Sequence, residues 1–273
     1  MVSYIVSRGI EEIADDSSGN AGSSLAAYAA KANISCRIYT PASASEEKLI
    51  QIAIYGADLT KVKGQRHHVT EKLLEDKRKA GFYYASHNIN PYFLEGAKTI
   101  AFEVCEQFDW DPPAHLIFPV GGGALIIGAY NGFRQLKQME LIEDMPKLHV
   151  AQSESCDPVV KAFNDDGEFP DITPRKTIAE GIHIKKPERG HEIMQVLKES
   201  GGGAVSVKEE VIKEFFQTLP QKEGIFCEPT SAVAIAALKE LVEKNDVQTD
   251  EKVLIPLTGG GLNDIKSAKL LKH

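Results

Sequence analysis

The stretch that decides the fold reads ADDSSGNAGSSLAAYAAKA, residues 14–32. Its turn-prone serine, glycine and asparagine residues stand directly before a run of alanines that favours a helix. A short segment, EEIA at residues 11–14, precedes them and is the expected strand. A turn at a helix start presents free backbone N–H groups and a partial positive charge. The stretch therefore predicts a strand, a turn that can hold an anion, and a helix.

Two further stretches share this design, HLIFPV-GGGA-LIIGAYNGF from residue 115 and KVLIPL-TGGGL-NDIKSAKLL from residue 252. In an open parallel sheet such turns lie at the carboxyl edge of the strands, where ligands bind. GGGA offers backbone donors alone, which suits a phosphate, whereas SSGN adds hydroxyls and a carboxamide that suit a carboxylate. A tight strand–helix connection explains any one of them, but three together favour a ligand site. Ile126 occupies the third glycine position of GxGxxG, so no nucleotide motif is complete.

Strands and helices alternate at short spacing along the whole chain. The expected strands are residues 11–14, 35–41, 57–63, 81–86, 115–120, 147–154, 203–207 and 252–258. The expected helices are residues 1–8, 20–32, 45–56, 66–80, a long helix from Phe93, 123–138, 189–200, 208–218 and 229–244, with 157–187 irregular. This alternation predicts an α/β fold of two lobes, each a doubly wound, mainly parallel sheet, with the site in the cleft between them. We place the small lobe at 1–92 and the large lobe at 93–273.

Composition excludes several classes of partner. The net charge of −8, with no basic cluster, argues against nucleic acid and anionic membranes. Residues 115–133 carry no formal charge when His115 is neutral, but Pro119 and five glycines argue against a membrane span. The four cysteines form no CxxC pair, so we expect reduced thiols, a cytoplasmic protein and no metal site.

Five motifs in this order resemble the threonine synthases, fold type II pyridoxal-phosphate enzymes related to tryptophan synthase β and cysteine synthase. They are SSGNAGSSLAAYAA, NPYFLEGAKTIAFEV, PVGGGAL, EPTSAVAIAAL and LTGGGL. The resemblance runs through nearly the whole chain. It implies pyridoxal 5'-phosphate as cofactor, conversion of O-phosphohomoserine and water to threonine and phosphate, and a homodimer.

The resemblance also implies roles for particular residues. Asn20 faces the cofactor's 3′-oxygen, and Thr258 partners the pyridine nitrogen. The substrate carboxylate binds at Ser17, Ser18, Gly19 and Ala21. The cofactor phosphate binds at Gly121, Gly122, Gly123 and Ala124. Glu228 lies in a family motif near the cofactor, and we assign it no catalytic step.

One departure affects the chemistry. The family's Schiff-base lysine lies in a Ser-x-Lys-Asp type motif, and the 273 residues contain no such motif. Lys31, Lys98 and Lys266 do not obviously replace it, so we assign no catalytic residue. We expect the first part of the large lobe to be missing too, and the chain to be inactive or impaired.

Two alternatives stay open at this point. The parent enzyme is a threonine/serine dehydratase or a cysteine synthase-like enzyme, or the chain is a non-catalytic protein that binds pyridoxal phosphate or another phosphorylated anion. Release of ammonia from threonine separates a dehydratase from a threonine synthase.

Overall fold

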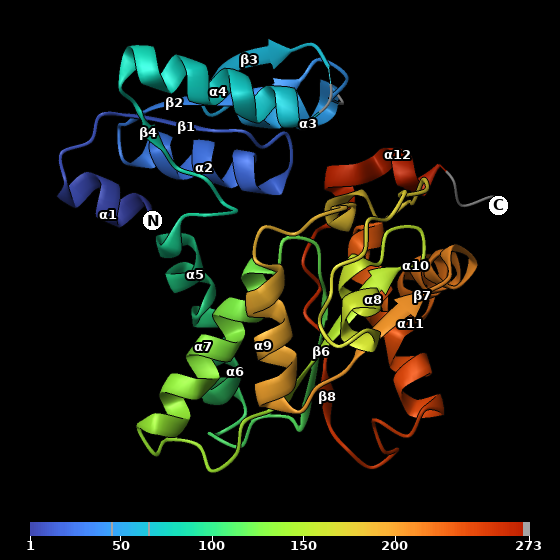
Figure 1. The fold of residues 1–273 in the computed structure, drawn as a ribbon. Helices are drawn as coiled ribbons and strands as arrows, with labels where there is room; N and C mark the ends of the chain where they lie inside the picture. Colours follow the sequence, from blue (N-terminus) through green and yellow to red (C-terminus); the bar gives the residue numbers. More distant parts are fainter. Residues whose placement is uncertain (45, 65, 270–273) are drawn as a thin grey trace. The chain divides into compact units, whose positions relative to one another are not determined.

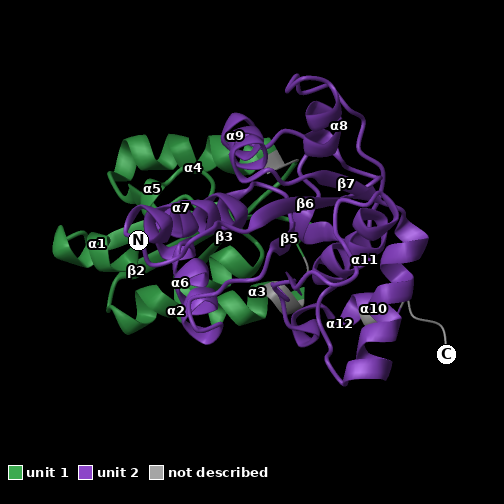
Figure 2. Ribbon diagram, turned by 90° about the horizontal axis from the view of Figure 1, so that it is seen from below, with its two compact units in different colours: residues 1–93 green, residues 94–273 purple. Residues whose placement is uncertain are grey.

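The computed structural model describes residues 1–44, 46–64 and 66–269. The chain divides into two compact units, Met1–Phe93 and Leu94–His273 (Figure 2). Each unit contains one four-stranded sheet, and all the paired strands named below run parallel. The expected α/β class with mainly parallel sheets is confirmed.

Unit 1 is built on the sheet order β3-β2-β1-β4 (Figure 1). Its strands are β1 (Glu12–Asp15), β2 (Ser35–Pro41), β3 (Asp58–Val62) and β4 (Tyr83–Tyr84). Its helices are α1 (Val2–Ser7), α2 (Asn20–Lys31), α3 (Glu46–Ala53), α4 (Arg66–Ala80) and α5 (Pro91–Ala97), the last of which continues into unit 2. The part of the predicted helix at residue 45 lies outside the described residues.

Helices cover both faces of this sheet. Ile13 and Ile38 lie in one cluster with the buried residues of α1, α2 and α3. Their neighbours Ala14 and Tyr39 lie in a second cluster with Val69 and Leu73 of α4. Adjacent strand residues point to opposite faces, so the two clusters mark the two faces of one doubly wound sheet.

Unit 2 is built on the sheet order β7-β6-β5-β8. Its strands are β5 (His115–Pro119), β6 (Lys147–Ser153), β7 (Ala204–Val207) and β8 (Val253–Leu254). Its helices are α6 (Thr99–Gln107), α7 (Ala124–Gln138), α8 (Pro158–Asn164), η1 (Glu180–Ile182), α9 (Gly190–Ser200), α10 (Glu209–Glu223), α11 (Pro229–Glu243), η2 (Gly261–Asp264) and α12 (Ile265–Ala268).

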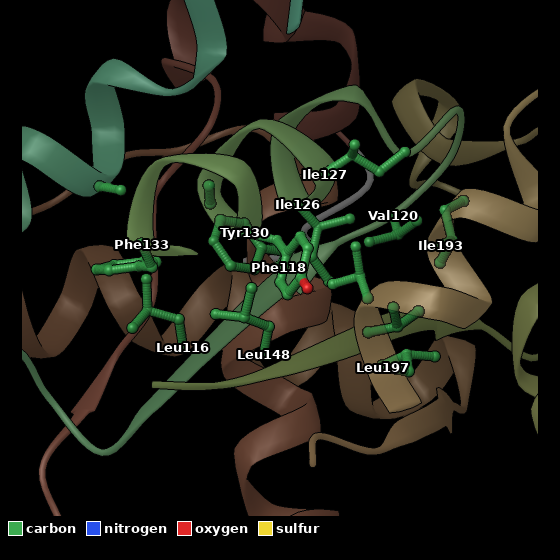
Figure 3. Close-up of a cluster of buried hydrophobic side chains, with 14 of the residues drawn as sticks. Leu116, Phe118, Val120, Ile126, Ile127, Tyr130, Phe133, Leu148, Ile193 and Leu197 are labelled. Carbon is green, nitrogen blue, oxygen red and sulfur yellow. The ribbon is translucent and has the colours of Figure 1, made fainter. Parts of the chain in front are cut away.

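The core of unit 2 is again divided by the sheet. Leu116 and Phe118 pack with α6, α7 and α9 in the cluster drawn in Figure 3. Ile117, between them, packs with α10 and α11 on the other face. Within the described residues, no helix is both long enough and apolar enough to cross a membrane. The four cysteines are free and buried.

Both sheets have the same switch point. β1 leads to its neighbour β2 on one side, and β4 lies on its other side. β5 leads to β6 on one side, and β8 lies on its other side. The carboxyl ends of strands beside such a reversal form the usual ligand crevice of an open α/β sheet. The SSGN turn follows β1, the GGGA turn follows β5, and Thr258 follows β8.

Three expectations about elements were wrong. The long helix from Phe93 is two helices, α5 and α6, interrupted at Lys98, where the Thr99 hydroxyl donates to the Gly96 carbonyl at 3.1 Å. The segment 157–187 contains a helix, α8, which begins at Pro158 and buries Val159 and Val160. The last predicted strand is short, and a 3-10 turn and the four-residue α12 follow the third glycine turn. Residues 270–271 of the predicted final helix lie outside the described residues.

Candidate functional site

The SSGN turn, residues 17–20, joins the end of β1 to the start of α2. Gly19 is the N-cap of α2, and its N–H donates to the Ser17 hydroxyl at 3.4 Å. Ser17 is buried, Ser18 and Gly19 are half-buried, and Asn20 is exposed. The Ser17 hydroxyl therefore holds the turn, while the open positions of the turn are Ser18 to Asn20.

Gly22 gives this turn its shape. A Cβ on Gly22 would lie 2.1 Å from the Ser17 carbonyl oxygen, far inside van der Waals contact. Only glycine lets the first turn of α2 approach the backbone of the SSGN turn so closely. Gly22 belongs to the SSGNAGSSLAAYAA motif, but this contact could not be predicted from the sequence.

The GGGA turn, residues 121–124, joins β5 to the 15-residue helix α7. Gly123 is the N-cap and has φ +85°, a left-handed conformation that favours glycine. A Cβ there would lie 2.5 Å from Ile193, and one on Gly121 would lie 3.0 Å from the Ile182 Cα. The turn is therefore packed tightly from behind, with Gly122 and Ala124 half-buried.

This turn fits a phosphate. The first N–H groups of α7 have no partner within the helix, and the positive end of its dipole lies at the same place. Backbone donors of this kind, without side-chain bulk, are what a phosphate needs at a helix start. The residues present therefore suit the phosphate group of a cofactor.

Gln152 of β6 supports the GGGA turn from inside the protein. Its side-chain N–H donates to the Val120 carbonyl at 2.9 Å, one residue before the turn. Its side-chain oxygen accepts from the Val159 N–H, also at 2.9 Å, at the start of α8. Gln152 is fully buried, so its amide fixes the turn and α8 together. Sequence reasoning missed it, because it lies within an apolar strand.

Thr258 lies on the TGGG loop, residues 258–261, and is exposed. Its hydroxyl is 3.3 Å from the hydroxyl of Ser231, which also accepts from the Gly259 N–H at 3.2 Å. The loop continues beside residues 226–228, where the Glu228 N–H donates to the Gly259 carbonyl at 2.8 Å. Ser231, in the first turn of α11, therefore positions Thr258, a role that the EPTSA motif did not reveal.

Lys31 and Lys98 lie outside the SSGN and GGGA turns. Lys31 is the last residue of α2, at the opposite end of that helix from the SSGN turn. Lys98 pairs with Glu95 and lies 3.5 Å from Gln135, with its side chain only 17% exposed. Burial raises the pKa of the Cys227 thiol, which keeps it protonated beside Glu228.

A model of the family described as "Pyridoxal-phosphate dependent enzyme" matches residues 1–259. The chain belongs to this family. Its cofactor is pyridoxal phosphate, and the GGGA turn is a site in this chain that fits the cofactor's phosphate. The expected family and cofactor are thereby confirmed, whereas the individual site residues stay predictions.

Threonine synthases are among the relatives of this chain. That of Methanocaldococcus jannaschii is 37% identical over 264 residues, and that of Methanosarcina acetivorans 35% identical over 260. The alignments cover 95% and 94% of this chain but only 64% of each relative, so the chain spans less than two thirds of their length. The crystal structure of serine racemase from Dictyostelium discoideum has a similar fold, with TM-score 0.75, 25% identity, and coverage of 92% of this chain and 76% of that one.

Proposed function

We propose that this chain forms the binding part of a pyridoxal-phosphate-dependent lyase of threonine synthase type, which converts O-phosphohomoserine and water to threonine and phosphate. The single observation that carries the proposal is that the SSGN, GGGA and TGGG segments follow the strands beside the switch points of the two sheets. The identity to two threonine synthases supports the choice of reaction.

In unit 2 the GGGA turn would hold the cofactor's phosphate. Gly121, Gly122, Gly123 and Ala124 offer backbone donors at the start of α7, and Gln152 keeps the strand end behind them in place. A dianionic phosphate gains both from these donors and from the helix dipole.

Thr258 would bond the pyridine nitrogen. Because the Ser231 hydroxyl oxygen accepts from Gly259, its own proton can be donated to Thr258, and the Thr258 hydroxyl proton is then free to point outwards. A neutral hydroxyl partner leaves the ring nitrogen without a full positive charge. When bound, the cofactor supplies an electron sink for carbanion chemistry.

In unit 1 the SSGN turn would bind the amino-acid substrate. Ser18, Gly19 and Ala21 would direct their N–H and hydroxyl groups to the substrate carboxylate, and Ser17 would hold the turn. Asn20 would bond the cofactor's 3′-oxygen. The N-terminal dipole of the 12-residue helix α2 favours an anion at this place.

We further propose that a polypeptide of residues 1–273 binds the cofactor but does not catalyse the reaction. The chemistry needs a lysine in a Ser-x-Lys-Asp type motif, and these residues contain none. Lys31 and Lys266 lie in α2 and α12, and Lys98 lies between α5 and α6. A cytoplasmic location is part of the proposal, because free buried thiols persist in reducing compartments.

A homodimer completes the proposal. Several large apolar side chains of unit 2 are exposed, among them Ile225, Leu262 and Ile265, at 46%, 77% and 54%. Apolar side chains of this kind on a surface favour association. Sedimentation analysis tests it, because a monomer at micromolar concentration contradicts it.

A chimera tests the reaction. It joins a segment that carries a Ser-x-Lys-Asp type motif, taken from a threonine synthase, to residues 1–273. With pyridoxal phosphate we expect phosphate release from O-phosphohomoserine, and none from the same chimera with that lysine changed to alanine. Ammonia from threonine without phosphate release makes the parent a dehydratase instead. Cofactor binding without either product makes the chain a binding protein.

A further inference from the structure

Three side chains of unit 1 come together at the carboxyl end of its sheet. Asp15 ends β1 and Asp16 follows it, and His87 follows β4, which pairs with β1 at Ala14 and Tyr84. One ligand atom from each of the three lies within 4.8 Å of the others. The His87 Nδ1 is 2.9 Å from the Asp15 Oδ2. The pairing of two parallel strands therefore assembles a cluster from residues 72 positions apart in sequence.

The two carboxylates are deeply buried. Asp15 is 1% exposed and Asp16 is 2% exposed. Within the part of the chain that the structure describes, the Asp15 Oδ1 has no hydrogen-bond partner. Burying a carboxylate oxygen without a donor or a cation is costly.

Outer partners orient Asp16. The Tyr84 hydroxyl donates to its Oδ1 at 2.8 Å, and the Thr70 hydroxyl donates to its Oδ2. A carboxylate that binds a metal commonly accepts hydrogen bonds of this kind from neighbouring side chains, which fix its direction. Each Asp16 oxygen retains acceptor capacity beside these bonds, because a carboxylate has about four lone-pair sites.

The spacing matches the coordination of a divalent ion. Bonds of about 2.1 Å to a six-coordinate metal place adjacent ligand atoms about 3.0 Å apart and opposite ones about 4.2 Å apart. The 2.9 Å between the His87 Nδ1 and the Asp15 Oδ2 equals one such edge. All three ligand atoms lie within 4.8 Å of one another, a limit slightly beyond the longer span. Two oxygen ligands with one imidazole suit a first-row divalent ion.

We propose that Asp15, Asp16 and His87 form a site for one divalent first-row cation, with Tyr84 and Thr70 as supporting partners. The ion would supply positive charge beside the buried Asp15 Oδ1. The site directly precedes the SSGN turn at Ser17. If that turn binds a substrate carboxylate, as proposed above, the cation also removes the repulsion from two buried negative charges.

The test uses Mn2+ alone as the probe, with the chelator-treated 273-residue chain and no pyridoxal phosphate. Loss of the free Mn2+ signal in electron paramagnetic resonance counts bound ions. We expect one saturable site per chain, a Kd raised at least about tenfold in Asp15→Asn and His87→Gln, and a smaller increase in Tyr84→Phe. Asp58→Asn, which changes an exposed carboxylate of the same unit, should bind as the wild type does.

A melting curve without metal checks that each variant is folded, and Mn2+ should raise the melting temperature of the wild type but not that of Asp15→Asn. Absence of saturable binding by the wild type overturns the proposal, as does equal affinity in Asp15→Asn and His87→Gln. Because no cofactor is present, neither result bears on the proposed lyase function.

Discussion

Gly22→Ala tests how the turn before α2 is held. The added Cβ would lie 2.1 Å from the Ser17 carbonyl oxygen, so helix and turn must separate by more than about 1 Å to reach ordinary contact. Overpacking of this kind costs about 3 kcal/mol where the obstacle is backbone. The better helix propensity of alanine returns about 1 kcal/mol.

The expected net effect is a loss of about 2 kcal/mol from the free energy of unfolding of unit 1. For a unit of this size that lowers its melting temperature by about 10 °C. Differential scanning calorimetry of the chain measures it. Gly96→Ala is the matched control, because Gly96 is also helical but has nothing within 4 Å of a new Cβ. The reasoning is refuted if Gly22→Ala melts at or above the wild-type temperature, as Gly96→Ala should.

Three further predictions concern unit 2. Gln152→Leu leaves the Val120 carbonyl without its hydrogen-bond partner. It should lower the free energy of unfolding by about 2 kcal/mol and weaken the binding of pyridoxal phosphate. Urea and cofactor titrations that match those of the wild type would contradict this. Burial, and then the neighbouring His115, lower the pKa of His149 from 6.5 to about 4. As the pH falls, the unfolded chain therefore binds the proton before the folded chain does. The free energy of unfolding should fall by roughly 3 kcal/mol from pH 6.5 to pH 4. A urea midpoint that is flat over that range, or one that His149→Gln does not flatten, would refute the account. Ser231→Ala removes the hydroxyl that holds Thr258. It should weaken cofactor binding several-fold and lower the free energy of unfolding by about 1 kcal/mol. A cofactor titration identical to that of the wild type would exclude this role of Ser231.

The bounds of several strands and helices could be predicted from local patterns. The strand Ser35–Pro41 was predicted with its observed bounds, since apolar residues end there at a proline. The helices Asn20–Lys31 and Arg66–Ala80 were predicted to within one residue, because turn residues precede the first and a glycine follows the second. Local propensity is sufficient where it agrees with tertiary packing.

The missed elements depend on contacts that are distant in sequence. α8 begins at Pro158 and has its first N–H groups bonded to Gln152 of the preceding strand. The polar composition of residues 157–187 as a whole suggested an irregular segment instead. β8 is short because the chain beyond Leu254 turns to lie beside residues 226–228 instead of extending the sheet. No local pattern carries either contact.

The site divides in the same way. The glycine turns and Thr258 were visible in the sequence, because strand, turn and helix signals are local. The residues that support them, Gln152 and Ser231, could not be predicted, because they act through side-chain hydrogen bonds to other elements. The cluster of Asp15, Asp16 and His87 forms only when β1 pairs with β4, so no short metal motif marks it in the sequence.

The most direct test of the central claim is a titration of pyridoxal phosphate into the 273-residue chain, followed by absorbance, before and after borohydride. The account predicts saturable binding that Gly123→Ala weakens at least about tenfold, and no adduct fixed by borohydride on any lysine. Gly167→Ala is the control, because Gly167 also has positive φ, +92°, but lies in open space. The account is contradicted if the wild type shows no saturable binding, if both variants bind alike, or if mass spectrometry finds one lysine modified.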